Sequence, residues 1–195
     1  FERICYVPNS FLSHCAPEPQ SVNHDGISIS SNFRIACVGR LCPQKDPYFF
    51  GKVAKLVRAK TSNVDFLWIG DGDPVLRRAL EADGVQVSGW LPHARTIALL
   101  KSSHIYAHVA RWEGAPISLI EAASLRMPII ARDIPALRSL GTPNLMKTPS
   151  EFCQAILDFV SNKDKVTQAI IETDNFIAQF APKHQRAALE LLYMK

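Results

Sequence analysis

The chain has 195 residues, of which 47% are hydrophobic and 21% are charged. This composition is typical of a globular domain and excludes disordered, collagen-like and coiled-coil proteins. The 22 basic and 18 acidic residues give a net charge of +4 without any block of Lys or Arg. This indicates a mild preference for anions, and we expect no nucleic-acid partner. Apolar runs are far shorter than the ~20 residues that a membrane-spanning helix needs.

Strand-like and helix-like runs alternate along the chain. The strands that we expect are short apolar runs at residues 34–38, 65–69, 85–88, 104–109, 128–131 and 144–147, with a further strand-like run at 4–7. Runs with helical spacing lie between them. This alternation predicts an α/β fold, a doubly wound, Rossmann-like parallel sheet with helices on both faces.

The helices between the expected strands carry start and stop signals. Asp46-Pro47 and Asp73-Pro74 each combine an N-cap with a proline suited to the first turn. Gly84 would follow the end of the second helix. Further helices are expected at residues 96–102 and 117–125, and two or three more over 151–192 with a break at Pro182.

The cysteines and histidines indicate neither disulfides nor a metal site. The cysteines are odd in number, unevenly spaced and without a Cys-x-x-Cys pair, which favours a reducing cytosol: Cys5, Cys15, Cys37, Cys42 and Cys153. His104 and His108 would share one face of a helix, but their surroundings predict a strand, on which they lie ~13 Å apart. The other histidines, including His93, are isolated, and we expect no bound metal.

The loops that follow the strands should hold the ligand, because open doubly wound sheets bind at the carboxyl ends of their strands. The first of these loops, residues 39–46, lacks the glycine fingerprint of dinucleotide-binding sheets and the Gly-Lys-Ser/Thr ending of a P-loop. It contains Arg40 and Lys45, two cations that can converge on a phosphate. Two solvated surface cations remain the alternative interpretation.

The loop after the second expected strand reads Gly-Asp-Gly-Asp-Pro over residues 70–74. It lacks the third glycine of a nucleotide fingerprint. Asp73 is better explained as a helix N-cap than as half of a metal-binding Asp-x-Asp pair. Gly72 would let the backbone approach a ligand closely, so this loop is a candidate contact for a base or a ribose.

The most informative loop spans residues 111–122. A tight turn precedes a helix that opens at Pro116, and the free N–H groups of that helix make an anion site. Together with the two cations of the first loop, this site favours a diphosphate. Glu113 and Glu121 would accept hydrogen bonds from sugar hydroxyls on either side of it. The alternative is a capping carboxylate and a solvated helix residue.

A series of segments resembles, in order, the C-terminal domain of the family 4 retaining glycosyltransferases, or glycosyl transferases group 1. The segments are Val-Gly-Arg-Leu with the lysine that follows (38–45), Phe-Leu-Trp-Ile-Gly-Asp-Gly-Asp-Pro (66–74), Val-Ser-Gly-Trp-Leu-Pro-His (87–93) and Arg-Trp-Glu-Gly-Ala-Pro-Ile-Ser-Leu-Ile-Glu-Ala-Ala-Ser (111–124). The resemblance implies the C-terminal half of a GT-B fold, in which two Rossmann-like domains face each other.

The resemblance also implies roles for individual residues. Arg40 and Lys45 would contact the donor diphosphate and offset the charge on the leaving group. Glu113 would lie near the transferred sugar, which makes these three residues the expected catalytic set, and Glu121 would lie near the ribose hydroxyls. Backbone N–H groups of residues 115–118 would hold the sugar and phosphate. The whole expected donor-binding set is Gly39, Arg40, Lys45, Gly72, Leu91, Glu113, Gly114, Ala115, Pro116, Ile117, Ser118 and Glu121.

The implied activity is transfer of a hexose from a UDP-, GDP- or ADP-sugar to a glycan or lipid-linked acceptor, with retained anomeric configuration and without metal or cofactor. The chain would be one donor-binding domain, with an entry strand and linker at 1–32, the sheet at 33–148 and C-terminal helices at 149–195. The N-terminal acceptor domain would be absent, so we expect the fragment alone to be inactive. Family habit implies bacterial polysaccharide or lipopolysaccharide assembly, in the cytoplasm or peripherally at the inner face of the plasma membrane.

The chain departs from the family pattern at several points. Val109-Ala110 stands where many members have Pro-Ser, and Ala115-Pro116 where many have Phe-Gly. Residues 132–137 resemble a variant of the sugar-side loop. A GT-B sugar-nucleotide epimerase, a non-catalytic binding or scaffold module, and an unrelated doubly wound domain remain alternatives.

Overall fold

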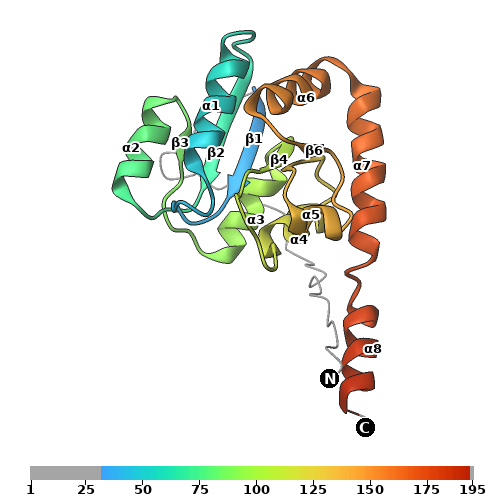
Figure 1. Ribbon diagram of the computed structural model, residues 1–195. Coiled ribbons are helices and arrows are strands. Elements are labelled where there is room, and N and C mark those ends of the chain that lie inside the picture. Colours follow the sequence, from blue (N-terminus) through green and yellow to red (C-terminus); the bar gives the residue numbers. More distant parts are fainter. Residues whose placement is uncertain (1–31, 194–195) are drawn as a thin grey trace.

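The computed structural model describes residues 32–193 and confirms the expected fold class (Figure 1). One sheet holds all its strands in parallel, in the order β3-β2-β1-β4-β5-β6. The strands are β1 Phe33–Val38, β2 Val64–Ile69, β3 Gln86–Val87, β4 Ile105–His108, β5 Ile129–Arg132 and β6 Leu145–Met146. Each expected strand within this range is present, whereas the strand-like run at residues 4–7 lies outside the described residues.

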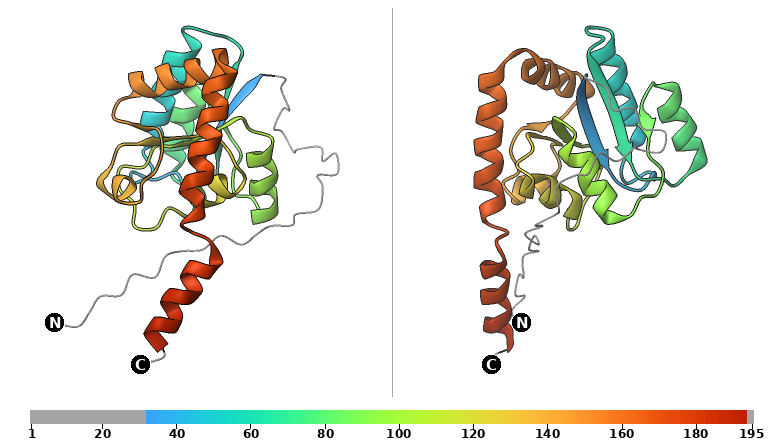
Figure 2. Two further views of the ribbon diagram at one scale, coloured as in Figure 1. Left: turned by 90° about the vertical axis from the view of Figure 1, so that its right-hand side faces the viewer. Right: turned by 180° about the vertical axis from the view of Figure 1, so that it is seen from behind.

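Helices cover both faces of the sheet, which places apolar side chains on both sides of each central strand (Figure 2). In β1, for example, Ile35 and Cys37 belong to one core cluster and Ala36 to the other. The first cluster includes side chains of α1, α2 and α6, and the second includes side chains of α3, α4, α5 and α7. The helices are α1 Pro47–Arg58, α2 Pro74–Ala82, α3 His93–Lys101, α4 Ile117–Ser124, α5 Pro135–Ser139, α6 Pro149–Ser161, α7 Lys163–Ala178 and α8 Pro182–Tyr193.

The expected caps fix the starts of the first two helices. The side chain of Asp46 accepts a hydrogen bond from the backbone N–H of Phe49, and Asp73 accepts from Val75 and Leu76. In each case a proline occupies the next position, where its missing N–H costs nothing. Asp73 is therefore confirmed as an N-cap.

Two helices differ from the sequence prediction. Helix α3 begins at His93 rather than at residue 96, because its N-cap is Pro92, which makes no side-chain hydrogen bond and so gives no sequence signal. Helix α5, Pro135–Ser139, begins within the segment 132–137 that resembles the sugar-side loop of the family, and no helix is predicted there. With only five residues, it is too short for a helical repeat of apolar positions to be visible.

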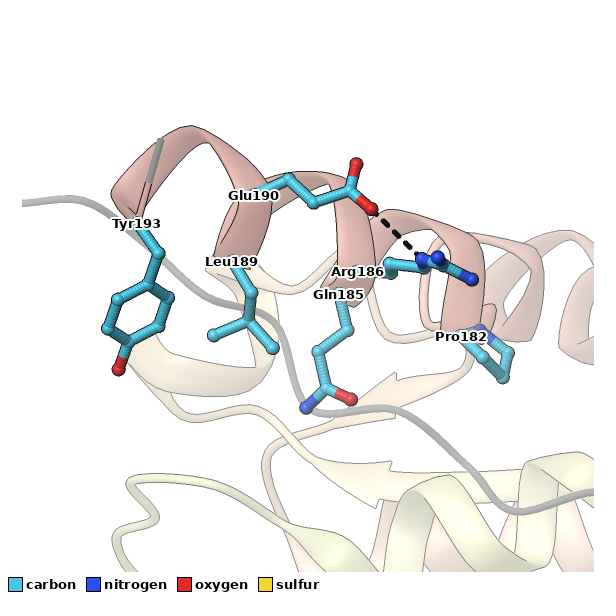
Figure 3. Close-up of a pocket in the computed structure, with 6 residues that line it drawn as sticks. All are labelled: Pro182, Gln185, Arg186, Leu189, Glu190 and Tyr193. Atoms are coloured by element: carbon cyan, nitrogen blue, oxygen red, sulfur yellow. Dashed lines mark hydrogen bonds and ion pairs between the residues drawn. The ribbon is translucent and has the colours of Figure 1, made fainter. Parts of the chain in front are cut away.

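The C-terminal helices α6, α7 and α8 confirm the expected break at Pro182. Helix α8 extends beyond the body of the sheet in all views (Figures 1 and 2). Six residues of α8 line a cavity of about 410 Å³. Figure 3 shows three of them, Gln185, Leu189 and Tyr193, on one side of the helix and the Arg186–Glu190 ion pair on another. None of the helices within residues 32–193 combines the length and apolar character that a bilayer crossing requires.

The strand order positions the candidate site. The chain leaves β1 toward β2 and β3, then crosses back to place β4 on the other side of β1. The strands β1 and β4 are neighbours, but the loops that follow them run in opposite directions along the sheet, toward β2 and β5 respectively. This switch point is where open α/β sheets bind their ligands.

Candidate functional site

The loops after β1 and β4 are joined by backbone and side-chain hydrogen bonds. The backbone N–H of Arg111 donates to the carbonyl of Gln44 at 2.8 Å, and the side-chain amide of Gln44 donates to the carbonyl of Trp112 at 3.1 Å. These bonds bring together two loops that lie more than 60 residues apart in sequence, so the edge expected to bind a ligand is already assembled.

Asp46 is the buried anchor between these loops. Its carboxylate accepts hydrogen bonds from Arg111 Nε at 2.8 Å and from Arg132 Nη1 at 2.7 Å, in addition to capping α1. The Arg132 guanidinium also lies over the Phe49 ring, 4.5 Å from its centroid. Burial raises the pKa of Asp46, but the two arginines outweigh it and hold the pKa below the ordinary value. The sequence identified Asp46 only as a cap and missed both arginines.

Glu113 and Lys45 form an ion pair across the two loops. The Glu113 side chain is 5% exposed and that of Lys45 is 19% exposed, with the Lys45 stem packed against Gly39. His108 Nε2 lies 3.3 Å from the same carboxylate oxygen, Oε1, that Lys45 contacts. Burial raises the pKa of Glu113, but hydrogen bonding and charge from His108 and Lys45 lower it overall. Glu113 is therefore an anion at neutral pH. Two residues of the expected catalytic set are thus in contact.

His108 belongs to a buried row of polar side chains beneath the loop. The Tyr106 hydroxyl lies 3.2 Å from His108 Nδ1 and 2.9 Å from Ser118 Oγ. Burial lowers the pKa of His108 and raises that of Tyr106, so the imidazole is neutral and the phenol protonated at neutral pH. Alternation of Tyr106 and His108 on one face of β4 was the available sequence signal, but their partners were not visible. His104, the residue before β4, instead accepts a hydrogen bond from the Arg34 backbone N–H.

Glu121 is paired with His93. The two side chains are hydrogen-bonded at 2.8 Å between Nε2 and the carboxylate, which joins the start of α3 to α4. Sequence reasoning treated His93 as isolated and so missed this contact. Leu91 is half-buried in the loop that leads to α3, and Trp90 beside it is 66% exposed.

The start of α4 differs slightly from the prediction. Pro116 is the N-cap rather than the first helical residue, and the Ile117 N–H donates to the carbonyl of Ala115 at 2.9 Å in a tight turn. No side chain caps this helix. Several residues of the expected donor-binding set are exposed: Arg40, Gly72, Gly114, Ala115 and Ile117. Three others are half-buried: Gly39, Ser118 and Glu121. Because the Ile117 N–H donates to Ala115, it is already used within the protein.

The glycines of the second loop are required by contact with the first loop. A Cβ atom at Gly70, where φ is +133°, would lie 2.2 Å from the carbonyl oxygen of Gly39. One at Gly72 would lie 2.4 Å from the carbonyl oxygen of Leu41. Trp68 Nε1 also donates to the Gly39 carbonyl at 2.8 Å. Packing between loops thus explains these glycines without a ligand, and the donor contact of Gly72 stays a prediction.

The Gly72→Ala variant should be less stable than the wild type by about 1–3 kcal/mol, because the added Cβ overpacks the Leu41 backbone. The shift would strain the hydrogen bonds that Leu41 makes with the backbones of Asp71 and Asp73. Gly114→Ala is the matched control, since a Cβ there meets nothing within 4 Å. Urea denaturation of both variants checks this, and equal stabilities would contradict the close-packing explanation.

Comparison with known families decides how this edge is interpreted. The model of the family described as glycosyl transferases group 1 matches residues 32–162. The chain belongs to this family. The family resemblance inferred from the sequence motifs is therefore confirmed.

This group 1 chain is similar to longer curated proteins. It is 31% identical over 113 residues to the Escherichia coli UDP-Gal:α-D-GlcNAc-diphosphoundecaprenol α-1,3-galactosyltransferase, over 53% of the chain and 29% of that enzyme. It is 26% identical over 184 residues to the phosphatidylinositol N-acetylglucosaminyltransferase GPI3 subunit of Saccharomyces cerevisiae, over 89% of the chain and 40% of that protein. The group 1 chain thus spans well under half the length of these relatives.

Solved structures confirm that the group 1 chain has the Rossmann-like domain of a GT-B protein. A variant of S. aureus TarM in complex with fondaparinux, α-GlcNAc-glycerol and UDP matches with a TM-score of 0.82 at 20% identity, over 100% of this chain and 40% of that one. The catalytic domain of cholesterol-α-glucosyltransferase from Helicobacter pylori matches with a TM-score of 0.61 at 20% identity, over 83% of this chain and 99% of that one.

Two cavities of this group 1 chain lie away from the candidate site. The α8 cavity and a second one of about 590 Å³, lined in part by Asn144, Glu172 and Gln179, contain none of the predicted site residues. Within residues 32–193 there is no group of three or more His, Cys, Asp or Glu side chains arranged to hold a metal. The candidate site is thus defined by its loops and charges.

Proposed function

We propose that this chain is the donor-binding half of a retaining, metal-independent hexosyltransferase that uses a nucleotide-diphosphate sugar. The observation that carries the proposal is the contact between Lys45 and Glu113 at the switch point of the sheet. It places a cation suited to phosphate and a buried anion suited to sugar hydroxyls side by side. Membership of glycosyl transferases group 1 supports the same reaction class.

Each loop would hold one part of the donor. Arg40, exposed and without an ion-pair partner among the described residues, would bind the diphosphate together with Lys45. The uncapped start of α4 would add the Ser118 backbone N–H to this anion site, because those of Ile117, Leu119 and Ile120 donate within the protein. Glu113 would accept hydrogen bonds from hydroxyls of the transferred sugar. Glu121, hydrogen-bonded to His93, would accept hydrogen bonds from the ribose hydroxyls. The two cations and the helix would stabilise the diphosphate leaving group without a metal.

The acceptor and the setting are proposed from relatives. The E. coli enzyme is named for a UDP-sugar donor and a lipid-linked acceptor, and the S. aureus structure holds UDP. We therefore propose a UDP-sugar as the first donor to test, a glycan or lipid-linked acceptor, and peripheral action at the inner membrane face. We also propose that transfer requires a further acceptor domain, so glycosyl transfer by residues 1–195 alone would refute that part.

Calorimetric titration with UDP, GDP and ADP, then with the matching nucleotide sugars, tests the proposal. We expect selective binding of one diphosphate that is unchanged by EDTA. Arg40→Ala should weaken this binding by about 1.5–3 kcal/mol, the usual contribution of a charge-assisted hydrogen bond. Arg78→Ala, at an exposed position on α2, is the control with the same change of charge. Binding of no diphosphate, or equal affinity of the Arg40→Ala variant, would refute the donor assignment.

A further inference from the structure

His108 makes a contact that the proposed donor site does not yet explain. It is 2% exposed, ends β4, and turns its Nε2 atom to Glu113 Oε1 at 3.3 Å. Nε2 makes no well-aligned hydrogen bond and is shielded from water, so the 3.3 Å approach to Glu113 is its polar contact. Burying a polar nitrogen costs free energy unless a polar partner compensates for it. The contact with the Glu113 carboxylate therefore needs an explanation beyond packing of the core.

The two known partners of the Glu113 carboxylate share one of its oxygens. Lys45 Nζ and His108 Nε2 both approach Oε1. Among the described residues no hydrogen bond or ion pair involves the other oxygen, Oε2, and Oε2 is not one of the shielded polar atoms without partners. The carboxylate is thus fixed from inside through one oxygen while the second stays accessible to a ligand.

The contact with the Glu113 anion determines which ring nitrogen of His108 carries the proton. A lone pair on Nε2 would repel the Glu113 anion, so the neutral ring carries its proton on Nε2. The Tyr106 hydroxyl lies within hydrogen-bond distance of both its neighbours, 3.2 Å from His108 Nδ1 and 2.9 Å from Ser118 Oγ. One row of polar contacts therefore runs from Ser118, at the start of α4, through Tyr106 and His108 to Glu113.

We propose that His108 is a positioning residue for donor recognition: its Nε2–H holds Glu113 so that Oε2 faces the sugar of the donor, and Tyr106 couples it to Ser118 at the phosphate side. This rests on the proposed function. His108 touches no part of the donor, and it acts by fixing the angle of the carboxylate. Losing it should therefore weaken recognition of the sugar but not of the nucleoside diphosphate.

The test compares the affinity of the full chain for a nucleoside diphosphate with its affinity for the matching nucleotide sugar. In His108→Leu we expect the nucleotide-sugar affinity to fall about tenfold, because a misoriented Glu113 would lose one hydrogen bond to the sugar. The diphosphate affinity should be unchanged. His108→Gln should retain both affinities, because its amide can donate to Glu113 and accept from Tyr106. His104→Leu, at the residue before β4 and ~13 Å away, is the matched control and should retain both affinities.

The outcomes separate the two proposals. Three outcomes would overturn the role of His108 alone. In His108→Leu, the affinities for the diphosphate and the nucleotide sugar could both be unchanged, or both could fall equally. Alternatively, His108→Gln could fail to retain the nucleotide-sugar affinity. Binding of no nucleoside diphosphate by the wild type would overturn the proposed function and this inference with it. If His108→Leu does not fold, imidazole ¹⁵N shifts decide: a neutral ring protonated at Nε2 that responds to Glu113→Gln supports the role, and a proton on Nδ1 overturns it.

Discussion

Asp46→Ala is expected to lower the free energy of unfolding by about 3–4 kcal/mol. About 1 kcal/mol is the loss of the N-cap of α1. The remaining 2–3 kcal/mol is the loss of hydrogen bonds to Arg111 and Arg132, since bonds to charged groups contribute more than neutral ones. The half-buried guanidinium of Arg132 keeps only its bond to the Val109 carbonyl and its contact with Phe49. Denaturation in urea measures the change.

Asp46→Asn is the matched variant that separates charge from capping. Asn retains the side-chain acceptor and tolerates the left-handed backbone of this residue, where φ is +49°. It should lose only the 2–3 kcal/mol that we assign to the charge. If Asn and Ala variants are equally unstable, or Asn is as stable as the wild type, the division between charge and cap is wrong.

The stability difference between the wild type and Asp46→Asn should depend on pH in the acid range. The pKa of Asp46 is lowered in the folded protein, so the carboxylate contributes its full stabilisation at pH values above its ordinary pKa of 3.8. This stabilisation is lost as the pH falls from there through the lower folded value, because protonated Asp46 no longer pairs with arginine. Unfolding curves at several pH values measure the difference, and a constant difference would contradict the ion-pair assignment.

Lys45→Met should weaken the binding of the nucleoside diphosphate about 10- to 100-fold, which corresponds to one charge-assisted hydrogen bond. It should also raise the pKa of Glu113, because burial then acts against His108 alone. Calorimetry measures the first effect, and a carboxyl ¹³C titration of Glu113 measures the second without any ligand. Lys52→Met, an exposed position on α1, is the control with the same change of charge. Unchanged values for both quantities would exclude Lys45 from the site.

The fold was largely predictable because its signals are local. The buried parallel strand β2, Val64–Ile69, is apolar at every position except Asp65. Asp46-Pro47 and Asp73-Pro74 mark helix starts by chemistry that needs no tertiary contact. The elements that were missed or shifted lack such signals. Helix α5 is shorter than two helical turns, and α3 starts after Pro92, which provides no cap.

The site was predictable only as far as topology determines it. Once a doubly wound sheet is assumed, the loops after β1 and β4 are expected to meet, and the contact of Lys45 with Glu113 agrees with this. The choice of partners for Asp46 and Glu121 could not be inferred. Asp46 and Arg132 are 86 residues apart, and nothing in the spacing of either residue indicates the other. Such pairs are determined by how the finished sheet brings loop ends together.

The three tryptophans lie at different depths around this edge. Trp68 is fully buried and hydrogen-bonded to the first loop, whereas Trp90 and Trp112 are 66% and 56% exposed in the loops after β3 and β4. A water-soluble quencher such as iodide will therefore reach the emission of Trp90 and Trp112 and leave that of Trp68 as an internal standard. Occupancy of the carboxyl edge can thus be followed by the protein's own fluorescence, without a label.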